Sequence, residues 1–315
     1  MKIVILDHFP LKEQKNKWKP ISDLGELTLH DRTEPHQILE RAKHADIIFT
    51  NKVPLQGSVL KKLPQLKYIG VLATGYNLID LKTAKSLKIV VSNVPAYSTA
   101  SVAQLVFSLL LESLNSISTH SQSVHQGDWT KCPDFSYTLK PLKELEQSIL
   151  GIIGLGNIGR NVAQIAQAFG MKVIAYSRTK RPTPGVQFKD LDTLSRESDF
   201  ISLHCPLNSE TQKIIDSAFL KKMKKNAWLI NTSRGPLIDE PALSHALNNN
   251  HIAGAALDVL SEEPPREDNP LLKAKNCIIT PHIGWSTVES KERLIEISIQ
   301  NLKAFIQKNP INQVQ

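Results

Sequence analysis

A glycine-rich turn between an apolar run and a helix-like stretch leaves this chain few possible folds. The run 149–153 leads into Gly154-Leu155-Gly156-Asn157-Ile158-Gly159, and residues 160–169 continue with a helix-like composition. In that context the first glycine makes the turn, the second lets backbone N–H groups approach a pyrophosphate, and the third lets the helix pack on the strand. The N-terminus of the helix also faces the anion. The segment therefore predicts a dinucleotide site; the alternative is a glycine-rich turn of an α/β fold without a ligand.

Short apolar runs separated by helix-like stretches recur along the whole chain. One series lies at residues 3–6, 47–50, 68–72 and 89–91, and a second lies at 149–153, 172–176, 200–204, 227–231, 253–257 and 277–280. Such buried runs are typical of parallel sheets that helices cover on both faces. We predict an α/β fold with two Rossmann-like parallel-sheet domains, one flavodoxin-like and one dinucleotide-binding, with an interdomain cleft.

The order of these runs also predicts how the domains divide. Ser98 or Thr99 can cap a helix with regularly spaced apolar residues, and Ser286-Thr287-Val288-Glu289 has the capping-box pattern that opens a last amphipathic helix. Because that helix follows the second series, we expect it to return to the first domain. We predict a substrate-binding domain of residues 1–98 and 286–315 and an NAD(P)-binding domain of residues 99–285. Residues 120–147 are interpreted as an ordered arm or partner contact, or alternatively as a surface loop with buried anchors.

The charge balance excludes few partners by itself. The chain has 38 Lys and Arg against 30 Asp and Glu, a formal net charge of +8, but the excess is spread along the sequence. Its densest run, at residues 221–225, is interpreted as a solvated helix end rather than a nucleic-acid contact. No helix-turn-helix, zinc-finger or RNA-binding signature accompanies it, so we expect no nucleic-acid partner.

Cysteine spacing and apolar run lengths indicate the compartment. Cys132, Cys205 and Cys277 are too far apart for a CxxC metal motif, so we expect no metal site and a reducing compartment, the cytoplasm. The N-terminal apolar run is too short for a signal peptide, and Leu105–Leu111 is too short to span a bilayer. We therefore expect no membrane partner.

The loop after run 172–176 bears on the choice of cofactor. An NAD site usually places an acidic residue there for the ribose hydroxyls, but this chain has Ser177-Arg178-Thr179-Lys180-Arg181 and no acidic residue between Glu146 and Asp190. A carboxylate would repel a 2′-phosphate, whereas a hydroxyl and cationic groups offer it charge-assisted hydrogen bonds. NADP(H) is therefore favoured; the alternative is that the cations only solvate the loop and NAD(H) binds.

Polar groups follow three of the later strand-like runs. Arg234 follows the run 227–231, Glu263 lies beyond Asp258, and His282 follows the last run. Ligands collect at the carboxyl ends of parallel strands, so these side chains can converge on one site. Such a set suffices to reduce a 2-keto acid: Arg234 holds the carboxylate and polarises the ketone, His282 protonates the developing alkoxide, and Glu263 stabilises the imidazolium.

At this point the chain resembles the D-isomer-specific 2-hydroxyacid dehydrogenase family over nearly its whole length. The motifs that carry the resemblance are the glycine turn together with Ala73-Thr74-Gly75-Tyr76-Asn77, Asn93-Val94-Pro95-Ala96-Tyr97-Ser98-Thr99, His204-Cys205-Pro206-Leu207, Thr232-Ser233-Arg234-Gly235, Leu257-Asp258-Val259 with Glu263-Pro264, and Pro281-His282-Ile283-Gly284. The resemblance implies a homodimer with the 120–147 arm at its interface. It also implies that Glu263, rather than Glu262, is the catalytic acid's partner, because the family's carboxylate directly precedes proline.

The resemblance also assigns the remaining site residues. Arg234, Glu263 and His282 match the family's catalytic residues, and Thr74–Tyr76 match its substrate-carboxylate loop, where backbone N–H groups can form an anion nest. The expected cofactor contacts are Thr99, Gly154, Gly156, Asn157, Ile158, Gly159, Ser177, Arg178, Thr179, His204, Pro206, Thr232, Ser233, Arg234, Asp258, His282 and Gly284. The expected substrate contacts are Ala73, Thr74, Gly75, Tyr76, Arg234, His282 and Trp285.

Within the family, the residues of several motifs are similar to those of glycerate dehydrogenases, also called hydroxypyruvate or glyoxylate reductases. Gln104 and the Trp285 that follows His-Ile-Gly belong to that likeness. The alternative function is a nucleotide-sensing corepressor-like binding module of the same fold. Two residues keep alternative roles: His204 either approaches the cofactor or serves the interior, and Trp285 either packs or forms a wall of the substrate site.

Overall fold

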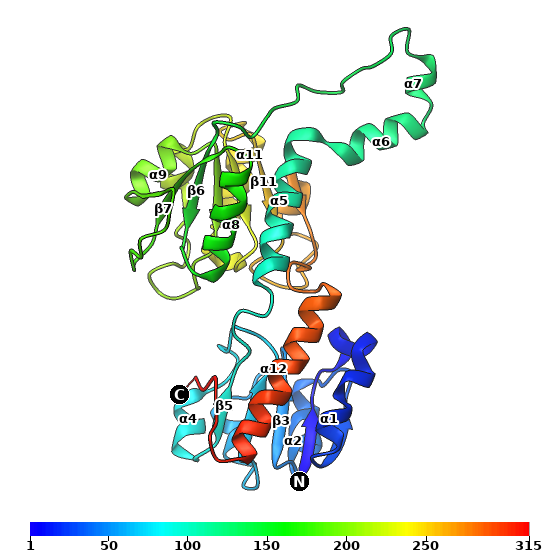
Figure 1. Ribbon diagram of the computed structural model, residues 1–315, viewed down its shortest axis with the longest axis vertical. Helices are drawn as coiled ribbons and strands as arrows, with labels where there is room; N and C mark the ends of the chain where they lie inside the picture. The colour runs from blue at the N-terminus through cyan, green and yellow to red at the C-terminus, as the bar shows by residue number, and fades with distance from the viewer. Residues whose placement is uncertain (315) are drawn as a thin grey trace. The chain divides into compact units, whose positions relative to one another are not determined.

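The computed structural model describes residues 1–314 and divides into two units, each built on its own parallel sheet (Figure 1). One unit comprises Met1–Ser98 and Ser286–Gln315, and the other comprises Thr99–Trp285. The chain thus leaves the first unit at residue 98 and returns to it for its last helix.

The first unit contains a five-stranded sheet in the order β2-β1-β3-β4-β5, with every neighbouring pair parallel. Its strands are β1 (Lys2–Ile5), β2 (Glu26–Leu29), β3 (Ile47–Thr50), β4 (Tyr68–Val71) and β5 (Val90–Ser92). Strands β3 and β4 are buried along their whole length, as expected for a sheet covered on both faces, whereas the edge strand β2 alternates exposed and partly buried residues. This is the strand order of flavodoxin-like folds.

Helices cover both faces of the five-stranded sheet. On one face lie α2 (Ile38–Ala42), α3 (Gly57–Leu60) and α4 (Leu81–Ser86), which share an apolar core with Val4, Ile48 and Ile69. Side chains that alternate to the other face pack against η1 (Phe9–Trp18), α1 (Lys19–Ser22) and α12 (Val288–Ile306), as the ring contacts Trp18–Phe49 and Tyr68–Phe305 show. A short helix, η2 (Pro35–Gln37), precedes α2.

Helix α12 begins at a different residue from the one that the capping-box pattern predicts. Thr287 is the N-cap, and its hydroxyl accepts a hydrogen bond from the N–H of Ser290 at 3.2 Å. Glu289 therefore lies in the first turn rather than at the third helical position. The predicted box starting at Ser286 is wrong by one residue, because the neighbouring threonine offers an equally good capping oxygen.

The second unit contains a seven-stranded parallel sheet in the order β12-β11-β10-β9-β6-β7-β8. Its strands are β6 (Ile149–Ile153), β7 (Lys172–Tyr176), β8 (Val186–Phe188), β9 (Phe200–Leu203), β10 (Trp228–Asn231), β11 (Gly254–Leu257) and β12 (Cys277–Ile279). Counting β6 as the first strand, this is the Rossmann order with β12 added at one edge. The two sheets confirm the predicted α/β class.

Helices also cover both faces of the seven-stranded sheet. On one face α5 (Thr99–Asn115) and α8 (Asn157–Ala168) share a core with Leu150 and Ile152. On the other face α9 (Leu191–Glu197), α10 (Ser217–Lys222) and α11 (Glu240–Asn248) share a core with Ile201, Leu229 and Leu257. The short helices η3 (Gly235–Leu237) and η4 (Pro270–Lys273) lie in the loops between strands.

The segment between α5 and β6 includes the arm predicted over residues 120–147. It contains α6 (Ile117–His125), α7 (Asp128–Lys131) and an extended stretch up to β6. The hydroxyl of Tyr137 lies 2.9 Å from that of Ser123, which donates to Asp128 at 2.6 Å, so the arm carries its own hydrogen bonds. Its other aromatics are not buried anchors: Trp129 is 51% exposed and Phe135 is 92% exposed.

The length and apolarity of the helices determine whether any of them could span a membrane. Among residues 1–314, no single helix is long and apolar enough to cross a membrane, although α5 and α6 pass the same test when taken together across a 56° bend. The apolar face of α5 packs into the core of the second unit.

Candidate active site

The glycine turn follows β6 and leads into α8. Gly154 has a φ of +99°, a left-handed conformation that favours glycine, and a Cβ there would overlap the backbone of Cys205. A Cβ at Gly159 would overlap the carbonyl oxygen of Gly154, so this glycine lets α8 pack closely. A Cβ at Gly156 would meet nothing within 4 Å, so the backbone there borders open space. The first and third glycines thus shape the turn, and the second leaves room for a ligand.

A cavity of about 490 Å³ opens in front of this turn. Its lining includes the expected contacts Gly154, Gly156, Asn157, Ser177, Arg178, Thr179, His204 and Pro206. It also includes Arg181 of the cationic loop, and it includes residues to which the sequence assigned no role, namely Arg160, Asn208, Glu210 and Thr211. The other expected cofactor contacts lie outside its lining. A cavity of this size, bordered by a helix N-terminus, fits the phosphate-bearing part of a dinucleotide.

The loop after β9 brings a carboxylate to the cationic end of the cavity. The side-chain oxygen of Asn208 accepts hydrogen bonds from the N–H groups of Glu210 and Thr211, at 2.9 and 3.0 Å. This turn places Glu210 beside Arg178, with 3.6 Å between the charged groups. The spacing Asn208-x-x-Thr211 is a turn signal that could have been read from the sequence. The pairing could not, because residues 178 and 210 are far apart in the chain.

His204 lines the same cavity from the end of β9. Its Nε2 lies 2.8 Å from the hydroxyl of Ser202, and burial lowers the pKa of His204 to about 3. The imidazole is therefore neutral at physiological pH. Both alternatives for this residue have support, since His204 lines the cavity and its ring contacts an interior hydroxyl.

His282 and Glu263 lie in direct contact. The Nδ1 atom of His282 is 2.7 Å from Oε2 of Glu263, and the two side chains are 25% and 31% exposed. The other carboxylate oxygen of Glu263 accepts the N–H of Leu260 at 3.3 Å, which ties it to its own loop. An Nδ1–H that donates to Glu263 leaves Nε2 as the free nitrogen of the ring.

Asp258 makes hydrogen bonds that fix the backbone of the loop containing His282. Its carboxylate accepts hydrogen bonds from the N–H groups of Ile283 and Gly284, both at 2.8 Å, and from the hydroxyl of Thr280 at 2.6 Å. Its carbonyl oxygen accepts the N–H of His282 at 2.9 Å. His282 has a φ of +53°, so these bonds stabilise an unusual backbone conformation. Asp258 was expected to contact the cofactor; its observed contacts are to this loop.

Arg234 follows β10, the strand next to β11. Its guanidinium donates to the carbonyl of Ser233 at 2.7 Å, and its own carbonyl accepts from the side chain of Asn231 at 2.9 Å. A Cβ on Gly235 would overlap the backbone of Leu260, so the loops after β10 and β11 touch. The candidates Arg234, Glu263 and His282 therefore come from the carboxyl ends of three adjacent strands, and Glu263 and His282 are in direct contact.

The hydroxyl of Thr232 is a further candidate for a contact with a bound ligand. Its residue is 8% exposed, and among residues 1–314 its buried hydroxyl has no hydrogen-bond partner. A buried hydroxyl without a partner costs free energy, so a ligand that bonds it would be favoured. The open space at Gly156 and this hydroxyl fit a bound dinucleotide.

The expected substrate loop, residues 73–76, belongs to the first unit. It follows β4 and is held by three hydrogen bonds: Val94 N–H to Ala73 at 3.0 Å, the Thr74 hydroxyl to Val94 at 2.9 Å, and the Asn93 amide to Thr74 at 2.7 Å. Within residues 1–314, the N–H groups of Gly75 and Tyr76 donate to no acceptor. Tyr76 is 40% exposed. Thr99 is the first residue of α5, and Trp285 is the last residue of the second unit.

No group of three or more histidine, cysteine or carboxylate side chains within residues 1–314 is arranged to hold a metal ion. The candidate site therefore consists of a dinucleotide cavity, an acid–base pair and an arginine.

The chain is similar in sequence to known proteins over its whole length. Residues 107–284 match the family model described as "D-isomer specific 2-hydroxyacid dehydrogenase, NAD binding domain". The chain is 46% identical over 320 residues to a hydroxypyruvate reductase of Blautia hydrogenotrophica, covering 100% of this chain and 99% of the relative. It is 41% identical over 283 residues to a glycerate dehydrogenase of Methylorubrum extorquens, covering 89% of each chain.

The chain is also similar to solved structures over its whole length. An acyclic imino acid reductase in complex with NADPH and D-Arg superimposes with a TM-score of 0.91 at 33% identity, covering 100% of both chains. A D-lactate dehydrogenase of Aquifex aeolicus in complex with NAD and lactic acid superimposes with a TM-score of 0.87 at 31% identity, again covering 100% of both chains.

Proposed function

The chain belongs to the D-isomer-specific 2-hydroxyacid dehydrogenase family, and we propose that its substrates are hydroxypyruvate and glyoxylate, reduced with hydride from NAD(P)H. The observation that carries this proposal is the contact of 2.7 Å between His282 and Glu263. The names of the similar hydroxypyruvate reductase and glycerate dehydrogenase support the choice of substrate.

The proton chemistry follows from the hydrogen bonds of His282. Glu263 accepts from Nδ1, which leaves Nε2 to donate a proton to the developing alkoxide oxygen. The carboxylate also stabilises the imidazolium while the proton is held there. The bonds from Asp258 fix the backbone of the histidine loop, so the ring is oriented before the substrate arrives.

Arg234 and the loop 73–76 would bind the substrate carboxylate. A guanidinium can make two parallel hydrogen bonds to a carboxylate and polarise the adjacent ketone. The N–H groups of Gly75 and Tyr76, which donate to no acceptor within residues 1–314, support an anion nest in the loop. Trp285 is proposed as a wall of the same substrate site.

The nicotinamide dinucleotide supplies the hydride, and the second unit would hold it. We propose that its phosphates lie at Gly154–Gly159, and that Thr99, Thr232, Ser233, Asp258 and Gly284 serve the remainder of the cofactor. We further propose that NADP(H) is preferred to NAD(H), because Ser177, Arg178 and Arg181 all line the cavity. Glu210 opposes this preference, since its carboxylate lies beside Arg178 and would repel a 2′-phosphate.

We also propose a homodimer that forms through the arm. Six apolar side chains in the segment between α5 and β6, which includes the arm, are exposed: Ile117, Val124, Trp129, Phe135, Leu139 and Leu142. Exposed apolar patches of this kind mark interfaces between proteins. Size-exclusion chromatography with light scattering tests this, since a monomeric mass would contradict it.

The spacing of the cysteines supports a cytoplasmic location.

Turnover of a panel of 2-keto acids with NADPH and NADH tests the proposed function. We expect hydroxypyruvate and glyoxylate to be reduced most efficiently. A corepressor-like module would bind the cofactor but turn over none of the panel; the His282–Glu263 pair disfavours that alternative, because sensing requires no acid–base chemistry.

A further inference from the structure

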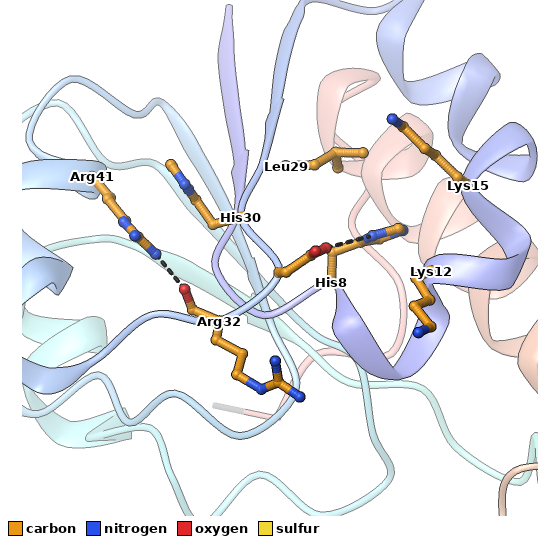
Figure 2. Close-up of a pocket in the computed structure, with 8 residues that line it drawn as sticks. His8, Lys12, Lys15, Leu29, His30, Arg32 and Arg41 are labelled. Atoms are coloured by element: carbon orange, nitrogen blue, oxygen red, sulfur yellow. Dashed lines mark hydrogen bonds and ion pairs between the residues drawn. The ribbon is translucent and has the colours of Figure 1, made fainter.

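A second cavity lies in the first unit, away from every residue assigned above. Its volume is about 540 Å³, and it is lined by His8, Lys12, Lys15, Leu29, His30, Asp31, Arg32 and Arg41. Lys12 and Lys15 stand on one side of it and His30 and Arg41 on the other, as Figure 2 shows. These residues come from four segments that follow or flank β1 and β2.

The backbone beneath this cavity is well defined. The N–H of His8 donates to the carbonyl of His30 at 2.8 Å, and the N–H of Phe9 donates to the carbonyl of Asp31 at 3.0 Å. The pairing of β1 and β2 therefore continues past both strand ends. The cavity therefore lies at the carboxyl ends of these strands, where α/β sheets usually bind ligands. Strand β2 is three places from β4, which carries the expected substrate loop. Strand β1 is two places from β4, so at about 4.8 Å per strand the strands beneath the cavity lie roughly 10–14 Å from β4.

The cations of this cavity lack carboxylate partners. Within residues 1–314, none of the four side chains Lys12, Lys15, Arg32 and Arg41 forms an ion pair with an acidic residue. The only carboxylate in the lining, Asp31, lies 3.7 Å from Nδ1 of His8 instead. Like charges that share a cavity repel one another, so a bound anion would relieve this repulsion.

Three of these cations, Arg32, Lys12 and Arg41, are held in place by neighbouring groups. The guanidinium of Arg32 lies 3.7 Å from the centre of the Phe9 ring, and the ammonium of Lys12 lies 4.5 Å from the same centre. Arg41 donates to the carbonyl of Arg32 and, at 2.8 Å, to the hydroxyl of Thr33. The donors are therefore partly ordered without a ligand, which lowers the entropic cost of binding one.

We propose that this cavity binds a small organic phosphate, independently of the catalytic function. A phosphate group carries up to two negative charges and three terminal oxygens, which match several guanidinium and ammonium donors better than a single carboxylate does. Leu29 and the imidazoles of His8 and His30 offer a less charged wall for the organic part. Burial lowers the pKa of both histidines, so four cations and one carboxylate set the charge at neutral pH.

Isothermal titration calorimetry with ribose 5-phosphate tests the site, with ribose and inorganic phosphate as matched probes. We expect one molecule of ribose 5-phosphate to bind per chain with a Kd of about 1 mM or tighter. Ribose should not bind, and inorganic phosphate should bind more weakly. Binding should weaken as ionic strength rises, because the cations are near the surface.

Variants locate the binding. Arg32→Ala and Lys12→Ala should each weaken it at least tenfold, about 1.4 kcal/mol. Lys43→Ala removes one exposed cation just after α2 and should leave the affinity for ribose 5-phosphate unchanged. Arg178→Ala should also leave it unchanged, which would exclude binding in the dinucleotide cavity. Thermal unfolding checks that each variant is folded. No saturable binding below about 10 mM, or equal weakening by Lys43→Ala, would overturn the proposal.

Discussion

The carboxylate of Asp258 accepts the N–H of Gly284 at 2.8 Å and so fixes the loop that carries His282. A Cβ on Gly284 would lie only 2.9 Å from the same carboxylate oxygen, which leaves no room for a larger residue without movement. The position of His282, the proposed proton donor, thus depends on a residue of the preceding strand end.

Asp258→Asn should therefore impair catalysis through the histidine loop. The amide nitrogen that replaces one oxygen cannot accept the N–H of Ile283 or Gly284, and an unsatisfied buried group costs about 1–3 kcal/mol. We expect kcat to fall and the Tm to drop. Thr280→Val, which removes only the hydroxyl donor, should have a smaller effect. Equal kcat for Asp258→Asn and the unmodified chain would show that the loop does not need these bonds.

Arg234→Lys should be poorly tolerated. An ammonium group cannot make the planar two-pronged contact that a guanidinium makes with a carboxylate. Losing one charge-assisted hydrogen bond, worth about 1.5–3 kcal/mol, should reduce kcat/KM for hydroxypyruvate by about tenfold or more. An unchanged kcat/KM would mean that Arg234 serves only its loop, through its bonds with Ser233 and Asn231.

The cofactor preference should depend on the Arg178–Glu210 pair. We expect kcat/KM to favour NADPH over NADH by about 10- to 100-fold, because the exposed site screens part of each charged contact. Glu210→Gln should strengthen NADPH use by freeing Arg178, and Arg178→Ala should weaken it with little effect on NADH. Ser177→Asp should reverse or erase the preference. An equal or greater kcat/KM for NADH in the unmodified chain would contradict the preference.

His204 should make stability depend on pH. Its folded pKa of about 3 lies below its ordinary value of 6.5, so the unfolded chain binds a proton first as pH falls. The stability from neutral His204 is complete above pH 6.5 and declines below it, by at most about 1.4 kcal/mol per pH unit. Urea unfolding at several pH values should show a steeper decline for the unmodified chain than for His204→Asn. Parallel curves would contradict a lowered pKa.

Local patterns in the sequence carry most of the information about the fold, and tertiary contacts carry the rest. The apolar runs predict both sheets, since a buried parallel strand needs only a few consecutive apolar residues. The choice between Ser286 and Thr287 as the cap depends on hydrogen-bond geometry, which either residue type allows.

The site divides in the same way. The glycine spacing and the strand-end residues Arg234, Glu263 and His282 could be read from motifs. Glu210 beside Arg178, and the bonds from Asp258 to the histidine loop, join residues on different loops. The cationic cavity of the first unit draws on four segments with no shared motif, so only the folded chain reveals it.

The reduction of hydroxypyruvate by the unmodified chain and by His282→Gln, measured side by side, tests whether the chain is a 2-keto acid reductase with His282 as its proton donor. The account predicts turnover by the unmodified chain and a loss of about 10²- to 10⁴-fold in kcat for the variant, because general acid catalysis contributes about that much. Cofactor affinity should stay unchanged, since the glycine turn is untouched. A folded His282→Gln variant with near-normal kcat, or an unmodified chain that reduces no 2-keto acid, would contradict it.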